Sequence, residues 1–155
     1  MSVCLVDTSI LCNLIPVPGR DQDQQAVEAG LTGHINKGVA LLLPLAAVLE
    51  TGNHVARLAD GRQRRKVALR FSQMVREAIE GKTPFTPTPF FEPDAVRHWL
   101  DEFPDAAMRG LGLADLSIIK EFKRQCELHP HRRVFIWSLD RHLASYQRPA
   151  RTPAP

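Results

Sequence analysis

Short continuous apolar runs alternate along the chain with longer segments in which apolar residues recur every three or four positions. The continuous runs, residues 3–6, 39–43 and 134–137, are typical of strands buried on both faces of a parallel sheet. The periodic segments predict helices at residues 9–15, 21–37, 45–58, 63–80, 93–103, 115–126 and 141–146. This alternation predicts an α/β fold with three layers, in which helices cover both faces of a central, mostly parallel sheet.

Prolines mark several predicted boundaries. Pro93 suits the first turn of a helix, and Pro104 should end that helix because proline lacks an amide hydrogen and clashes with the preceding turn. Residues 81–93 contain four prolines and predict a loop. Phe90 and Phe91 make this loop unlike a disordered linker, so we expect either a short strand or a packed loop segment there.

The length of 155 residues is that of one domain, which we expect to span residues 1–147. Residues 148–155 contain three prolines and no apolar face, and they predict a disordered tail. The three cysteines lack metal or redox spacing and predict reduced thiols. The sequence has neither an apolar run of membrane-spanning length nor the basic start of a signal peptide, so we expect a cytoplasmic protein without membrane contact.

Four acidic residues occupy positions where strands end or helices begin. Asp7 directly follows the first predicted strand, and Asp140 lies just beyond the last one. Glu50 lies in the helix after the second strand, and Asp115 begins a helix after a glycine-containing loop. Because the carboxyl ends of parallel strands and the starts of the following helices meet at one edge of a sheet, we expect these four side chains to lie close together.

Clustered carboxylates predict a cation site. Four of them cannot all be ionised at close range without a counter-charge. A site made only of carboxylate oxygens suits Mg²⁺ or Mn²⁺ rather than zinc. Such an ion polarises a phosphate oxygen and lowers the pKa of water, which is the chemistry that phosphodiester hydrolysis needs. The sequence leaves open whether one ion or two would bind.

Each acid also has an ordinary structural explanation. Asp7 and Asp115 could cap helices, Glu50 could be a solvent-exposed helix residue, and Asp140 could belong to a turn. A phosphatase with Asp7 as its nucleophile is a further alternative. Haloacid-dehalogenase-like enzymes carry a second aspartate two residues later, where this chain has Ser9, and this argues against that alternative.

The acids occur within four short segments, Val-Asp-Thr-Ser at 6–9, Val-Leu-Glu-Thr at 48–51, Ala-Asp-Leu-Ser at 114–117 and Ser-Leu-Asp at 138–140. Their order and strand context resemble the PIN domain, the nuclease fold of VapC-like toxins and of several RNA-processing enzymes. The resemblance extends from Val3 to the region of Tyr146. It implies a PIN-like, metal-dependent endoribonuclease that hydrolyses RNA.

The resemblance also implies roles for single residues. The catalytic and metal-binding carboxylates would be Asp7, Glu50, Asp115 and Asp140, holding Mg²⁺ or Mn²⁺. Ser9 would orient Asp7 or a bound water, and Ser138 would support Asp140. Asn53, one helical turn after Glu50, would help to hold the site.

Partners follow from charge and from the resemblance. The formal net charge of +3 permits a nucleic-acid partner without requiring one. The candidates for binding the RNA backbone are Arg62, Arg64, Arg65 and Lys66, although an ordinary solvated helix face is the alternative. The resemblance implies the toxin of a VapBC-type pair, with a cognate antitoxin and a homodimer, for which Phe85, Phe90 and Phe91 offer an apolar surface. A PIN-like module that binds RNA or a protein without catalysis is the second function we consider.

Overall fold

The computed structural model describes residues 1–152 and places five strands in one sheet, in the order β3-β2-β1-β4-β5. The strands are β1 (Val3–Val6), β2 (Ala40–Leu43), β3 (Phe85–Pro87), β4 (Val134–Trp137) and β5 (Gln147–Arg148). The helices are α1 (Thr8–Leu14), α2 (Gln24–Asn36), α3 (Leu45–Ala56), α4 (Gly61–Ile79), α5 (Pro93–Met108), α6 (Leu113–Leu128) and α7 (Arg141–Ala144). The pairs β1–β2, β1–β4 and β2–β3 are parallel, and only the short β5 runs antiparallel to its neighbour β4.

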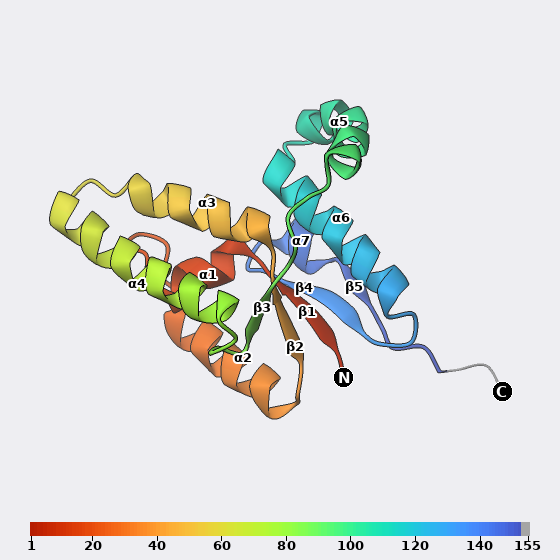
Figure 1. Cartoon of the computed structure of the whole chain (residues 1–155), viewed down its shortest axis with the longest axis horizontal. Coiled ribbons are helices and arrows are strands. Elements are labelled where there is room, and N and C mark those ends of the chain that lie inside the picture. Colours follow the sequence, from red (N-terminus) through yellow and green to blue (C-terminus); the bar gives the residue numbers. More distant parts are fainter. Residues whose placement is uncertain (153–155) are drawn as a thin grey trace.

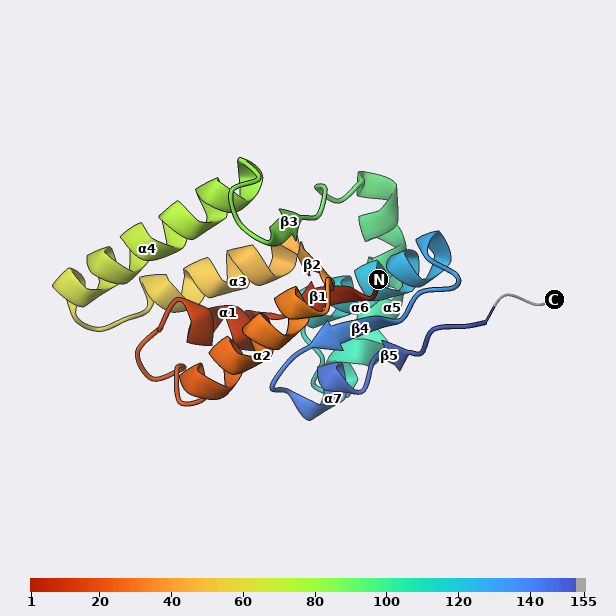
Figure 2. The ribbon, with the colours of Figure 1, turned by 90° about the horizontal axis from the view of Figure 1, so that it is seen from below.

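Helices cover both faces of this sheet. Figures 1 and 2 show α2 and α4 on one side of the strands and α5 and α6 on the other. The predicted three-layer α/β/α architecture with a mostly parallel sheet is therefore confirmed. None of the helices in the described part of the chain combines the length and the apolar character that crossing a membrane requires.

The central strand β1 lies inside the core. All four of its side chains are at most 2% exposed, since β2 and β4 flank it and helices cover both of its faces. This explains why its sequence is continuously apolar rather than alternating. On the α2 side, the helix packs closely against β4 through Gly30, where an added Cβ would lie only 2.9 Å from Trp137 Cζ2.

The prediction that Pro104 ends a helix is wrong. Helix α5 continues to Met108, and Pro104 removes only one hydrogen-bond donor from its interior. Two features stabilise the last turn. Ala106 is 1% exposed, and its carbonyl accepts a hydrogen bond from Leu111 N (3.0 Å) beyond Gly110, whose φ of +78° suits a glycine C-cap.

The segment that precedes α5 contains the strand β3, which the sequence did not predict at this position. Phe85 in β3 is 5% exposed and belongs to the core, so it offers no surface to a partner. Phe91 lies in a packed loop, where its ring contacts Trp99 edge-on with centroids 4.6 Å apart. Phe90 is 82% exposed.

The predicted tail begins too early at Arg148. This residue lies in β5, and its guanidinium donates hydrogen bonds to the carbonyls of Cys126, His129 and Arg132. These contacts tie the end of α6 and the following turn to β5. Residues 149–152 form neither helix nor strand, and the rest of the predicted tail, residues 153–155, lies outside the described residues.

Candidate functional site

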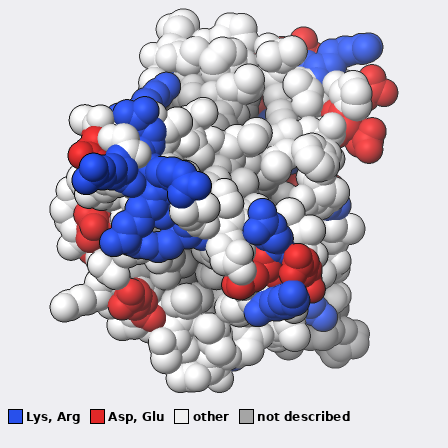
Figure 3. Space-filling view, turned by 60° about the vertical axis from the view of Figure 1, so that its left-hand side comes forward, with Lys and Arg blue, Asp and Glu red and all other residues white. Residues whose placement is uncertain are grey.

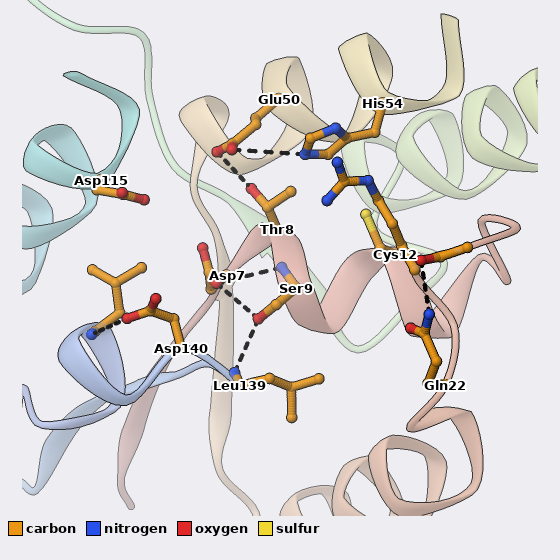
Figure 4. A pocket seen from close by; sticks show the side chains of 13 residues that line it. Asp7, Thr8, Ser9, Cys12, Gln22, Glu50, His54, Asp115, Leu139 and Asp140 are labelled. Carbon is orange, nitrogen blue, oxygen red and sulfur yellow. Dashed lines mark hydrogen bonds and ion pairs between the residues drawn. The ribbon is translucent and has the colours of Figure 1, made fainter. Parts of the chain in front are cut away.

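The candidate site lies at the carboxyl edge of the sheet, next to the ends of the neighbouring strands β1 and β4. Strand β1 is followed by α1, β2 by α3, and β4 by the Ser138–Asp140 loop, so three chain segments leave the sheet at one edge. A pocket of about 380 Å³ opens there (Figure 4). Its lining includes all four acids singled out in the sequence, Asp7, Glu50, Asp115 and Asp140.

Asp7 is the most firmly held of these acids. It is 4% exposed and forms the N-cap of α1. Its Oδ2 accepts hydrogen bonds from Ser9 N (3.3 Å), Ser9 Oγ (2.8 Å) and Ser138 Oγ (2.7 Å). These bonds fix one carboxylate oxygen, while the other points toward the space between the acids (Figure 4).

The hydroxyls of Ser9 and Ser138 join the end of β1 to the end of β4. Ser9 Oγ accepts a hydrogen bond from Leu139 N (3.0 Å), and Ser138 Oγ accepts one from Asp140 N (3.0 Å). The two oxygens lie 3.3 Å apart. Ser138 therefore contacts the carboxylate of Asp7 but only the backbone of Asp140.

Asp140 and Asp115 hold different places at the starts of their helices. Asp140 is the N-cap of α7, and its Oδ1 accepts hydrogen bonds from His142 N (2.8 Å) and Leu143 N (3.1 Å). Asp115 is not a cap, because α6 begins at Leu113 after the N-cap Gly112. The capping explanation thus applies to Asp7 and Asp140. It is compatible with a ligand site, since both caps also line the pocket.

Glu50 reaches the pocket from α3. Its Oε2 accepts a hydrogen bond from Thr8 Oγ1 (3.0 Å), and its Oε1 lies 3.7 Å from His54 Nε2, one helical turn later. Burial, followed by the charge of Arg20, lowers the pKa of His54. The imidazole is therefore neutral near pH 7 and gives Glu50 no full counter-charge.

The acids act on one another electrostatically. The pKa of Asp115 is raised from 3.8 to about 6, first by burial and then by the charges of Glu50, Asp7 and Asp140. Among the described residues, no lysine or arginine forms an ion pair with any of these four acids. The pocket therefore concentrates negative charge.

This donor set fits a hard cation by its chemistry, because it consists of carboxylate oxygens. A divalent ion would also supply the counter-charge that Asp115 lacks. In residues 1–152 as they stand, however, no three His, Cys, Asp or Glu side chains form a compact group of metal ligands.

The other predicted site residues lie outside this pocket. Asn53 lines a neighbouring, more apolar pocket of about 500 Å³ that shares Glu50 and His54 with the acidic one. The basic residues Arg62, Arg64, Arg65 and Lys66 are exposed in the first turns of α4. Arg64 also donates hydrogen bonds to the carbonyls of Leu58 and Ala59. Figure 3 shows a large cluster of lysine and arginine side chains at the left of the face in view, and smaller groups of them at the right.

The structure adds pocket residues that the sequence did not single out. They include Thr8, which binds Glu50, as well as Arg20 and His54. Thr8 lies directly after Asp7 in the sequence, and His54 lies one helical turn after Glu50, so adjacency carried a signal for Thr8 and helical spacing carried one for His54. Arg20 lies in the loop between α1 and α2, where no periodicity points to the site.

Comparisons with known proteins show the fold. Neither a family model nor a curated protein matches this chain. Among solved structures, the crystal structure of FitAcB from Neisseria gonorrhoeae is similar, with a TM-score of 0.56 and 22% sequence identity over 88% of this chain and 87% of that chain. The similarity covers most of both chains and shows a shared fold, in agreement with the three-layer α/β architecture predicted from the sequence.

Proposed function

We propose that the protein is a Mg²⁺- or Mn²⁺-dependent endoribonuclease that hydrolyses RNA phosphodiester bonds. One observation carries this proposal: four acids from four separate segments line one pocket at the carboxyl edge of a PIN-like sheet. Burial and, after it, the charges of Glu50, Asp7 and Asp140 raise the pKa of Asp115 to about 6, and this cost of ionising the carboxyl supports a site that works with a bound cation.

The residues of the pocket would have two different roles: the acids would bind the cation, and the hydroxyls would position the acids. Asp7, Glu50, Asp115 and Asp140 would hold the ion. When bound, a divalent cation neutralises the carboxylates, polarises a phosphate oxygen and lowers the pKa of water. The hydroxyls of Ser9 and Ser138 hold one oxygen of Asp7, and Thr8 orients Glu50. Neutral donors thus position the acids without reducing their charge.

The biological setting is a further part of the proposal. We propose that the chain is a cytoplasmic toxin of a VapBC-type toxin–antitoxin pair, restrained by a cognate antitoxin and assembled as a homodimer. Support comes from the sequence resemblance to VapC-like toxins and from the fold shared with FitAcB. The exposed basic start of α4 supports RNA as the substrate.

The test is cleavage of an end-labelled structured RNA in Mg²⁺, in Mn²⁺ and in EDTA. Wild type and Asp7→Asn are compared with Asp105→Asn, a control that removes an exposed carboxylate of α5 outside the pocket. We expect metal-dependent cleavage by wild type and the control, and its loss in Asp7→Asn. Cleavage retained by folded Asp7→Asn would refute the mechanism. RNA bound equally well in EDTA, without cleavage in either metal, would favour the non-catalytic binding module.

A further inference from the structure

A second hollow adjoins the acidic pocket and has the opposite charge. It has a volume of about 410 Å³ and is lined by Arg20 and Arg57 together with the segment Val17–Gly19, His54 and Leu58. Arg20 and His54 also line the acidic pocket, so the two hollows are contiguous. The second hollow has no acidic residue in its lining.

Both guanidinium groups are available to a ligand. Within residues 1–152, neither Arg20 nor Arg57 forms an ion pair with a carboxylate or a side-chain hydrogen bond, and both side chains are exposed. Their charges both act on His54, which lies between the two hollows. Two unpaired guanidiniums that face one hollow favour an anion, and arginine can bind phosphate through two parallel hydrogen bonds.

The backbone beneath these side chains is well fixed. Arg57 is the C-cap of α3, and its amide donates to His54 O (3.3 Å). The loop before Arg20 is anchored by Val17, which is fully buried and donates from its amide to Cys12 O (2.8 Å). Gln22 Nε2 closes the same loop by donating to Gly19 O (2.8 Å). The arginines thus extend from rigid positions on two different segments.

We propose that Arg20 and Arg57 form a phosphate subsite that binds the RNA phosphodiester next to the one that is cleaved. This inference rests on the proposed function, because the acidic pocket would hold the phosphodiester that reacts. The two hollows share Arg20 and His54, so a strand that enters the acidic pocket would place its next phosphate at the adjoining hollow. The positive charges of the subsite would offset the repulsion between the RNA backbone and the four acids.

Binding rather than cleavage tests the subsite. A fluorescent single-stranded oligoribonucleotide is titrated with the Asp7→Asn protein in Mg²⁺ and with wild type in EDTA, at several salt concentrations. Arg20→Gln and Arg57→Gln are compared with Arg76→Gln, which removes the same charge from an exposed position of α4 outside both hollows. We expect binding about tenfold weaker for each subsite variant. The slope of log K against log salt should fall by about 0.7 for each phosphate that the variant no longer neutralises.

A neutral backbone substitution identifies the phosphate that Arg57 binds. Each phosphate of the oligonucleotide is replaced in turn by a methylphosphonate, which carries no charge. At one position this replacement should weaken binding by the parent protein but not by Arg57→Gln. Arg57→Lys should keep the salt slope while losing part of the affinity, since an ammonium lacks the planar fork of arginine.

The outcomes separate the subsite from the nuclease. The subsite is refuted if Arg20→Gln and Arg57→Gln weaken binding no more than Arg76→Gln, or if no methylphosphonate position depends on Arg57. Failure of the nuclease would instead appear in the cleavage assay as the absence of metal-dependent cutting by wild type. Unchanged thermal melting of the arginine variants excludes unfolding as the cause of weaker binding.

Discussion

Replacing Asp115 by asparagine should stabilise the metal-free protein while it abolishes cleavage. The carboxylate lies in a pocket with three other acids, and its burial, followed by their charges, raises its pKa to about 6. Asparagine has nearly the same shape and carries no charge at any pH. Asp115→Asn therefore removes both the cost of burying a charge and the repulsion from the other acids without opening a cavity, but it also removes one candidate metal ligand.

The size of the stabilisation by Asp115→Asn follows from the pKa shift of Asp115. A rise from 3.8 to about 6 is roughly 2 units, and each unit corresponds to about 1.36 kcal/mol, which gives a ceiling of about 3 kcal/mol. Asp115 is only partly buried, so solvent screening reduces this to about 1 kcal/mol. For a chain of this length, that corresponds to a rise in Tm of about 2–4 °C.

The stability difference between Asp115→Asn and wild type depends on pH. Because the pKa of Asp115 is raised in the folded state, its contribution to stability is fully present below pH 3.8 and is lost as the pH rises through about 6. In EDTA, the advantage of Asp115→Asn should be absent near pH 4 and complete by pH 7.5. With Mg²⁺ or Mn²⁺, wild type should be more stable than Asp115→Asn, since a ligand at a hundred times its Kd stabilises wild type by about 2.7 kcal/mol.

Urea denaturation at both pH values, with and without metal, measures these differences. Asp7→Ala serves as the contrasting variant, because it removes an N-cap and the acceptor of three hydrogen bonds and should cost about 1–2 kcal/mol at either pH. If Asp115→Asn is destabilised in EDTA at pH 7.5, or gains equally at pH 4, then neither the burial of the charged Asp115 nor its repulsion by the other acids sets the stability of the metal-free pocket.

Two further predictions concern stability away from the pocket. Gly30→Ala should lower the free energy of unfolding by about 1–3 kcal/mol because the new Cβ would meet Trp137, whereas Gly33→Ala on the same helix has open space and should raise it by about 0.5–1 kcal/mol. Urea denaturation followed by tryptophan fluorescence compares the two variants, and equal effects would contradict the tight contact at Gly30. Arg148→Ala should lower the free energy of unfolding by about 1.5–3 kcal/mol because it removes the hydrogen bonds to three carbonyls, and Arg148→Lys should recover only part of this loss. Thermal melting measures the change, and an unchanged Tm would mean that β5 contributes little to stability.

The central part of the fold could be predicted because its strands are buried on both faces. A run such as Val3–Val6 has no polar position, and this favours a central strand buried on both faces. The edge strands β3 and β5 have three and two residues, too few to show any periodicity. The end of α5 was predicted wrongly at Pro104 because local helix propensity takes no account of the burial of Ala106.

Helical geometry explains which site residues could be predicted. An α-helix turns by about 100° per residue, so Asn53 and His54 project about 60° and 40° to opposite sides of Glu50. His54 consequently lines the acidic pocket with Glu50, whereas Asn53 lines only the apolar one. Sequence spacing predicted Asn53 near Glu50 and applies equally to His54, but it could not tell which side of the helix faces the acids, since that depends on how α3 packs against α1 and α6.

The charges of the site are separated in a way that suits the proposed chemistry. Inside the pocket, the groups that bind the carboxylates are neutral: the hydroxyls of Thr8, Ser9 and Ser138 and backbone amides. A lysine or arginine paired with these acids would satisfy their charge and leave no need for a cation. Arg20 lines both the pocket and the adjoining hollow, and Arg57 lines only the hollow; within residues 1–152 neither forms an ion pair with a carboxylate, so both can attract a polyanion. A pocket that retains its negative charge beside a hollow that retains its positive charge would suit the nuclease that we propose, because a phosphodiester nuclease must bind a divalent ion and an RNA strand together.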